Sequence, residues 1–229
     1  KASFLCAKFY IFVFNKIMQN SSITFTSNIH FVDRKTYNLI KKKNSIGFWH
    51  NTPNILKADE FYSEGIKTCT GGGVVIPFKE AEGFHFWDDR TNKKNFSQIV
   101  NSLFRFVKNP QRALLVGSKD LEGNPYSIEQ FQRLKKVFLE RIKDVTLFEK
   151  HNFDNAQTHY HYSLKDDTWT LFSEYRKSDN GRYHTVKDLK SLKECFENIS
   201  IAEGDKLFLN GKEIKISDAP EIFVTKKEA

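Results

Sequence analysis

Residues 62–75 read YSEGIKTCTGGGVV, and residues 83–88 read GFHFWD. These two stretches contain a thiol at Cys69, an imidazole at His85 sixteen positions later, and a hydroxyl at Ser63 six positions before the thiol. A cysteine attacks carbon as its thiolate, and a neighbouring histidine is the usual base that forms the thiolate. A polar group that orients the imidazole completes such a site. We therefore interpret Cys69, His85 and Ser63 as candidate nucleophile, base and orienting residue.

The same stretches are predicted to form strands over 65–78 and 83–87, joined by a turn over 80–83. Side chains alternate between the two faces of a strand, so His85 and Trp87 should share one face. The two phenylalanines that flank the histidine should occupy the opposite face.

The distances within this site place a condition on the fold. Six residues of extended chain span roughly 20 Å, so Ser63 approaches Cys69 only if the chain turns back, and Gly65 is the residue that can turn there. A tight hairpin with its turn over 80–83 would set His85 opposite Phe78 rather than Cys69. Either the glycine triplet bends the chain at the thiol, or the two strands are not simple hairpin neighbours.

The rest of the chain mixes helices and strands without regular alternation, which is typical of an α+β fold. We expect a mixed or antiparallel, sandwich-like sheet core flanked by about three helices. The predicted elements are strands over 22–32, 113–116, 145–148, 159–163 and 168–174, helices over 96–107, 127–142 and 185–199, a loop over 41–54 that exposes Trp49 and His50, and a hairpin over 207–216 with a turn at Asn210-Gly211.

Three ranges describe the expected domain organisation. Residues 1–17 are apolar and aromatic and are followed by Met18, a candidate translation start, so we interpret them as an extension of doubtful origin. Residues 18–150 are predicted to form the catalytic core. Residues 151–229 are predicted to form a hairpin and helix region packed on the same domain.

Composition narrows the class of protein. The 229 residues include 39% hydrophobic and 14% aromatic residues and carry a net charge of +8, which is typical of a folded chain. The charge favours acidic partners, but the lysines are dispersed and no DNA- or RNA-binding motif accompanies them. We therefore do not expect nucleic acid as the partner. Three cysteines indicate a reducing compartment rather than a disulfide framework, and no apolar run is long enough to predict a membrane span.

The stretch around the thiol resembles the chemotaxis receptor deamidase CheD and the catalytic domains of cytotoxic necrotizing factor toxins. CheD carries a pattern like Thr-x-Gly-x-Gly-Ser-Cys. Here Ser63 takes the place of the Thr, Gly65 matches the first Gly and Cys69 matches the nucleophile, whereas Lys67 and Thr68 replace the second Gly and the Ser. The resemblance extends over about residues 61–150, because the order of elements after the thiol is also similar.

The resemblance implies a thiol-dependent deamidase that converts a glutamine side chain of a folded protein substrate to glutamate and releases ammonia. Cys69 would attack the amide carbon, His85 would transfer protons and Ser63 would orient the imidazole, with backbone N–H groups around the thiol as the oxyanion hole. No metal or organic cofactor is implied. The family is bacterial and acts in the cytoplasm or after secretion into a host cell, and the high lysine, asparagine and phenylalanine content of this chain indicates an effector or toxin.

Other residues near this set have secondary interpretations. Asp88, directly after the strand of His85, is an alternative orienting residue. We expect Gly71, Gly72 and Trp87 to lie close to the substrate, since glycines after a nucleophile allow a close approach.

Three alternatives stay open at this point. A Cys–His pair also serves transglutamination or proteolysis. The basic composition also suits a non-enzymatic module that binds protein or nucleic acid. His159 and His161 share one face of a predicted strand near His151, a spacing that could bind zinc or iron, although no third ligand is evident.

Overall fold

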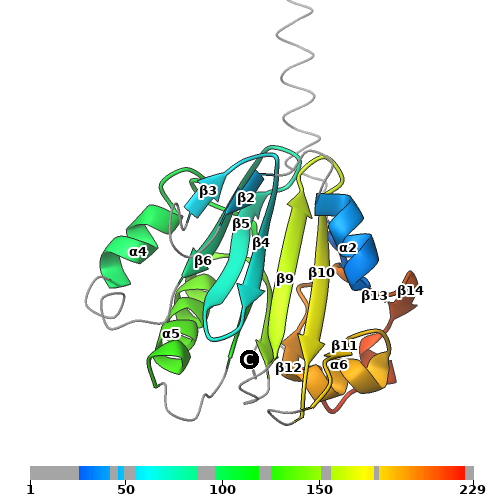
Figure 1. The fold of residues 1–229 in the computed structure, drawn as a ribbon. Helices are drawn as coiled ribbons and strands as arrows, with labels where there is room; N and C mark the ends of the chain where they lie inside the picture. Colours follow the sequence, from blue (N-terminus) through cyan, green and yellow to red (C-terminus); the bar gives the residue numbers. More distant parts are fainter. Residues whose placement is uncertain are drawn as a thin grey trace, which may run out of the picture.

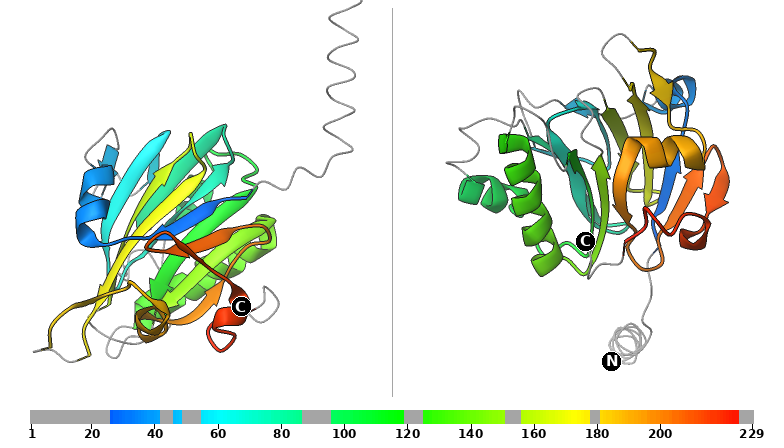
Figure 2. Two further views of the ribbon diagram at one scale, coloured as in Figure 1. Left: turned by 90° about the vertical axis from the view of Figure 1, so that its right-hand side faces the viewer. Right: turned by 90° about the horizontal axis from the view of Figure 1, so that it is seen from below.

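The computed structural model describes residues 26–41, 46–48, 55–86, 96–118, 125–150, 156–177 and 181–224. Two mixed β-sheets pack face to face, with helices outside them (Figures 1 and 2). This arrangement confirms the predicted α+β, sandwich-like fold. The described α-helices are α2 (Arg34–Lys41), α4 (Phe96–Leu103), α5 (Pro125–Arg141) and α6 (Leu189–Cys195).

The first sheet has eight strands. Its order is β14-β13-β1-β10-β9-β4-β2, and β11 pairs with β10. Strand β1 is parallel to both of its neighbours, whereas β9 is antiparallel to β10 and to β4. The strands are β1 (Asn28–Phe31), β2 (Ile46–Phe48), β4 (Glu60–Ile66), β9 (Gln157–Ser163), β10 (Thr168–Tyr175), β11 (His184–Thr185), β13 (Lys206–Leu209) and β14 (Lys212–Ile214).

The second sheet has six strands in the order β12-β8-β7-β5-β6-β3. Helices α4 and α5 cover its outer face, while α2 lies beside the eight-stranded sheet (Figure 1). The strands are β3 (Ile55–Lys57), β5 (Thr70–Ile76), β6 (Glu80–Phe86), β7 (Arg112–Ser118), β8 (Asp144–Lys150) and β12 (Phe196–Ser200), and a short 3₁₀ helix, η1 (Ile216–Asp218), follows β14.

Two hydrophobic cores follow from these layers. Phe31, Phe61 and Tyr160 belong to the core between the two sheets. Phe84 and Phe138 belong to the core between the six-stranded sheet and its helices, where their rings meet edge to face. The six-stranded sheet is therefore buried on both faces, which explains the near-continuous apolar runs of β7 and β8.

One edge of the six-stranded sheet brings several strand ends together. Strand β5 is antiparallel to β6 and β7, and β7 is parallel to β8. The start of β5 at Thr70 therefore lies at the same edge as the ends of its neighbours, at Phe86, Ser118 and Lys150. We call this edge the Cys69 edge, because Cys69 directly precedes β5.

The chain around the thiol differs from the predicted single strand over 65–78. It forms β4 and β5, which belong to different sheets, with a bend over 67–69 between them. Gly65 makes the return possible, since its φ of +73° lies in the left-handed region. The predicted turn over 80–83 is also wrong: the turn lies over 77–79, so β6 begins three residues earlier than expected.

The predicted helix over 185–199 is shorter than expected. The Asp188 carboxylate accepts a hydrogen bond from the Ser191 N–H at 2.8 Å and so caps α6. The helix ends at Cys195 because Phe196 begins β12, which pairs with β8. Tertiary pairing thus overrides the helical spacing of the apolar residues.

Other predictions have mixed outcomes. The Asn-Gly hairpin is confirmed, because Asn210 and Gly211 both have positive φ between β13 and β14. The predicted loop over 41–54 contains β2, while Trp49 and His50 lie outside the described residues. Helix α2 was not predicted. Strands β9 and β12, which follow residue 150, pair with β4 and β8, so the two predicted ranges contribute to the same sheets.

The carboxyl group of Glu82 gives the fold a testable pH dependence. It is buried, it accepts a hydrogen bond from the Val107 N–H at 3.3 Å, and burial raises its pKa to about 8. Between the ordinary glutamate pKa and about 8 the folded state holds this proton and the unfolded state does not. Stability from this group therefore falls as pH rises through that window, by roughly 1.4 kcal/mol per pH unit.

Glu82→Gln should remove this loss. We expect the free energy of unfolding of the variant, minus that of the wild type, to grow from about pH 5 to about pH 8 and then to level off. Urea unfolding at a series of pH values measures it, with Glu80→Gln on the same strand as the matched control. A difference that stays constant over the series would contradict a buried, protonated carboxyl.

Candidate active site

Ser63 and His85 meet between the two sheets. Ser63 lies on β4 of the eight-stranded sheet and His85 lies on β6 of the six-stranded sheet. The Ser63 Oγ is 2.8 Å from the His85 Nδ1, and both residues are buried. Packing of one sheet on the other thus creates the contact that the spacing of these residues predicted.

The hydrogen bonds around this contact fix the imidazole tautomer. The Ser63 hydroxyl donates to the Phe48 carbonyl at 3.0 Å, and the nearby Tyr160 hydroxyl donates to the Phe84 carbonyl at 2.6 Å. Each hydroxyl has one proton, and a carbonyl can only accept. The bond between Ser63 and His85 therefore has the Nδ1–H as donor. The network assigns the Nε2 as the basic nitrogen of the ring.

Cys69 lies close in the chain to the strand pair that carries this imidazole. In the β5–β6 pair, Gly71 is directly opposite His85. A Cβ at Gly71 would meet Ile66 and Tyr160, so this pair of positions faces the eight-stranded sheet. Cys69 lies two positions before Gly71, in the bend that precedes β5, and His85 lies one position before the end of β6. The register thus places the thiol and the base at the Cys69 edge.

The thiol is nearly enclosed rather than at an open cleft. Cys69 is 5% exposed and His85 is 1% exposed, so neither side chain lies in an open cleft. The chain just before the thiol reaches solvent, since Lys67 is exposed and Thr68 is half-buried.

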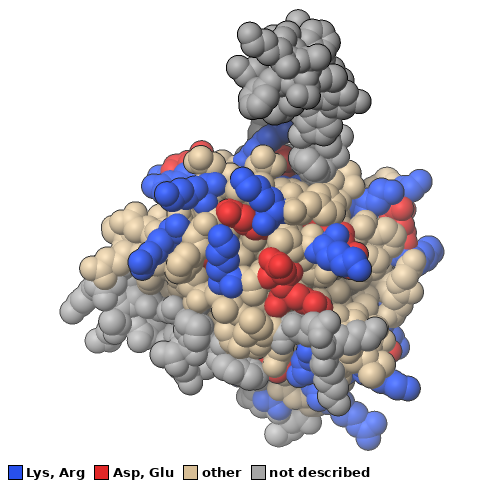
Figure 3. All heavy atoms as spheres, turned by 90° about the horizontal axis from the view of Figure 1, so that it is seen from above, with Lys and Arg blue, Asp and Glu red and all other residues tan. Residues whose placement is uncertain are grey.

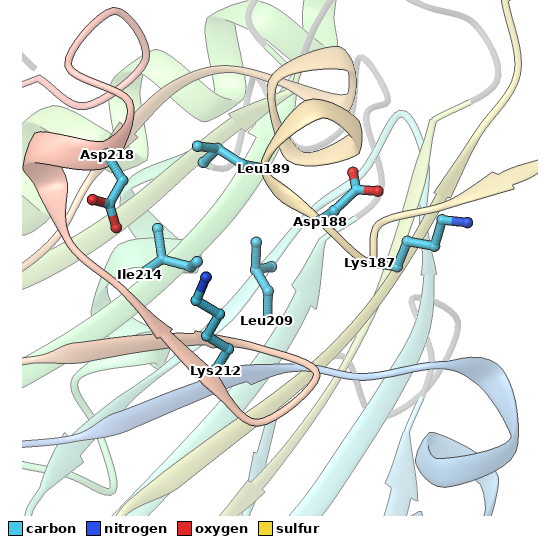
Figure 4. Close-up of a pocket in the computed structure, with 7 residues that line it drawn as sticks. All are labelled: Lys187, Asp188, Leu189, Leu209, Lys212, Ile214 and Asp218. Carbon is cyan, nitrogen blue, oxygen red and sulfur yellow. The ribbon is translucent and has the colours of Figure 1, made fainter.

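Two surface cavities lie elsewhere in the molecule. One, of about 320 Å³, lies between α6 and the β13–β14 hairpin, and its walls include Leu189, Leu209 and Ile214 (Figure 4). The other, of about 480 Å³, is lined by residues from β10 to α6, including Tyr183 and Lys190. Neither is lined by a residue of the candidate set.

The glycines after the thiol have a packing role. Gly72 has a φ of +149°, and a Cβ at this position would overlap the Leu114 carbonyl of β7. At Gly71 a Cβ would overlap the Ile66 side chain. The close approach of strands thus explains both glycines, and their proximity to a substrate stays a prediction. Trp87 and Asp88 lie outside the described residues.

The structure adds two residues that sequence reasoning missed. Tyr160 shares the hydrogen-bond network of Ser63. The alternation of histidine and tyrosine along residues 157–163 places Tyr160 on the face opposite the two histidines, which is a pattern that could have identified it. Lys150 is fully buried at the Cys69 edge and donates to backbone carbonyls next to the thiol. A lysine that ends an apolar strand gives no sequence signal of this kind.

The alternative metal site has a different explanation. His159 and His161 do share one face of β9, but His161 contacts a glutamate of β4, and the Nδ1 of His159 accepts a hydrogen bond from the Gly65 N–H at 3.3 Å. The His161 Nε2 is 3.0 Å from the Glu60 Oε1, and the His159 Nδ1 is 3.8 Å from the Glu64 Oε1. Burial lowers the pKa of His159 to about 4. Within the described ranges no three or more residues of metal-binding type cluster, and His151 lies outside those ranges.

The surface is consistent with dispersed charge. On the face shown in Figure 3, lysine and arginine side chains are scattered with acidic side chains between them, rather than merged into one basic stripe. A continuous stripe is the usual footprint of nucleic-acid binding. In the part of the chain that the structure describes, no helix combines the length and apolarity that crossing a bilayer requires.

A thiol beside a histidine with a basic Nε2 and a fixed Nδ1–H can perform acyl transfer. Ser63 and His85 lie on strands, and Cys69 lies in the bend that precedes β5, at an edge where strand ends converge. No protein-family model matches this chain, and no curated protein matches it.

Proposed function

We propose that this chain is a cysteine-dependent protein glutamine deamidase. The observation that supports it most is the buried Ser63–His85 hydrogen bond, which orients an imidazole near the edge of the sheet that Cys69 adjoins. This is the relation that the resemblance to CheD and the necrotizing factors implies for these three residues.

The first half of the reaction forms a thioester. The His85 Nε2 takes the Cys69 proton, and the thiolate attacks the side-chain amide carbon of a substrate glutamine. The imidazolium then donates its proton to the amide nitrogen, the C–N bond breaks and ammonia leaves. Ser63 accepts the Nδ1–H throughout and stabilises the imidazolium.

The second half restores the enzyme. The neutral imidazole takes a proton from water, whose oxygen attacks the thioester carbon. The C–S bond breaks, the thiolate leaves, and the imidazolium returns a proton to the sulfur. The product is glutamate, and the sum is hydrolysis of one amide to an acid and ammonia.

The burial of the thiol favours this reaction over its rivals. A glutamine side chain is long and thin, whereas a protease substrate must bring its main chain to the nucleophile. Water also reaches a nearly enclosed thioester more readily than the amine of a second protein, which transglutamination requires. A thiol that must stay reduced suits a bacterial protein that acts in the cytoplasm or inside a host cell.

A screen of folded protein substrates tests the proposal. Release of ammonia, together with the mass change of a glutamine peptide to a glutamate peptide, identifies deamidation; cleavage or cross-linking would identify the rivals. The Cys69→Ala variant is the control. Salt-sensitive nucleic-acid binding, with no release of ammonia from any substrate, would favour a binding module instead.

Removal of the Ser63 hydroxyl should impair turnover. Ser63→Ala leaves the His85 Nδ1–H without its acceptor, so the imidazole loses its fixed tautomer, and we expect kcat to fall by roughly 10²-fold with little change in KM. Ser63→Thr, which keeps the hydroxyl, should retain most of the rate. Equal rates for wild type and Ser63→Ala, measured as ammonia release, would remove Ser63 from the mechanism.

A further inference from the structure

Lys150 directs two of its three donors at the chain just before the thiol. It ends β8 at the Cys69 edge with no exposed surface. Its Nζ donates to the carbonyls of Ile66, Lys67 and Ala156, the last two at 2.7 and 3.4 Å. An ammonium group has three N–H donors, so these three carbonyls use them all. Two of the three acceptor carbonyls belong to the last residue of β4 and to the first residue of the bend over 67–69.

Within the described residues this ammonium has no acidic partner. The described ionisable groups that act on it are the thiols of Cys195 and Cys69 and the ammonium of Lys67, with no carboxylate among them. A buried cation without a counter-ion is costly, and burial accordingly lowers the pKa of Lys150 to about 8. The group is still largely protonated at neutral pH. An anion formed close to it would offset that cost.

The two thiols differ in their ability to supply this anion. Cys195 is fully buried, and burial raises its pKa to about 12, so it stays protonated. Cys69 is 5% exposed and lies at the edge of the sheet where the strand of His85 ends. Cys69 is therefore the thiol whose ionised form the ammonium can stabilise.

We propose that Lys150 is a positioning residue of this site: its carbonyl bonds hold the β4–β5 connection, and its buried positive charge favours the Cys69 thiolate. This inference rests on the proposed role of Cys69 as the nucleophile. Because its donors are occupied by carbonyls, Lys150 acts on the sulfur through charge and not as a proton donor.

The pH profile of Cys69 alkylation tests the proposal. The rate of iodoacetamide labelling, followed by peptide mass spectrometry, rises with the thiolate fraction. We expect Lys150→Met to move the midpoint upward by about one unit, which is about tenfold less thiolate near neutral pH. A purely structural role would change the plateau rate, through altered access, and leave the midpoint in place; an unchanged midpoint would overturn the proposal. Lys135→Met is the matched control, because Lys135 on α5 pairs with Glu149, the neighbour of Lys150 on β8.

A second variant keeps the test valid if Lys150→Met does not fold. In His85→Ala the ammonium remains, so the Cys69 midpoint should stay below the ordinary cysteine value of about 8.5. A midpoint at or above that value would show that the imidazole alone ionises the thiol and would overturn the role of Lys150. Both measurements report the ionisation of the Cys69 sulfur and do not depend on the release of ammonia. If no substrate is ever deamidated while these midpoints behave as expected, the proposed function fails and the charge pairing stands.

Discussion

Cys69→Ala is expected to abolish ammonia release, with a loss in kcat of roughly 10⁴-fold or more, since loss of a covalent nucleophile leaves only binding and any oxyanion stabilisation. The side chain is small and directly precedes β5, so the substitution should leave the fold intact. Its melting temperature, measured beside the rate, separates a chemical loss from a structural one.

Cys195→Ala is the matched control for this prediction. Cys195 lies in the core at the end of α6 and belongs to no part of the proposed mechanism. We expect its rate of ammonia release to equal that of the wild type within about twofold. Comparable turnover by Cys69→Ala and wild type would show that the reaction does not pass through this sulfur.

Arg112→Met is expected to cause the largest loss of stability, about 3–5 kcal/mol of the free energy of unfolding. The Arg112 guanidinium donates to the Ser27 Oγ at 2.8 Å, pairs with Asp205, and lies 3.6 Å from the Asp167 carboxylate. All of these groups are buried, and Asp205 also accepts a bond from the Thr146 hydroxyl. The substitution would leave two carboxylates in the core without their cation.

Two further variants make this test specific. Arg105→Met removes an exposed arginine and should change stability by less than about 0.5 kcal/mol. Adding Asp167→Asn and Asp205→Asn to Arg112→Met should recover part of the loss, because the buried charges are then removed together. Urea unfolding measures all three. A loss below about 1 kcal/mol for Arg112→Met would contradict a charge network that joins the two sheets.

Much of the fold was predictable because its signals are local. The helices over 96–103 and 125–141 follow from apolar spacing, and the hairpin at Asn210-Gly211 follows from the φ > 0 that its turn requires. Helix α2 was missed although it has a local signal, since the Asp33 carboxylate directly before it accepts a hydrogen bond from the Thr36 N–H at 2.7 Å. The switch from α6 to β12 was missed because it depends on tertiary pairing. Phe196 has helical spacing in the sequence, yet its backbone pairs with β8.

The candidate site was predictable in its residue types and not in its geometry. The pattern of Ser63, Cys69 and His85 identified the set, and Gly65 identified the turn that joins two of them. The register of His85 depends on a turn at 77–79, where Phe78 has a φ of +58°. Phenylalanine does not favour positive φ, so the sequence does not predict this turn. Lys150 comes close to Cys69 because only β7 separates β8 from β5 in the sheet. This strand order is not apparent from the local sequence.

If Cys69 is the nucleophile, its sulfur is ionised and accessible to reagents, in contrast to that of Cys195. The rate of iodoacetamide labelling of each cysteine, in the native wild-type protein near neutral pH and resolved by peptide mass spectrometry, measures this difference. We expect Cys69 to be labelled much faster than Cys195, whose thiol is fully buried. Labelling of Cys69 that is no faster than that of Cys195, or that begins only when the protein unfolds, would contradict it.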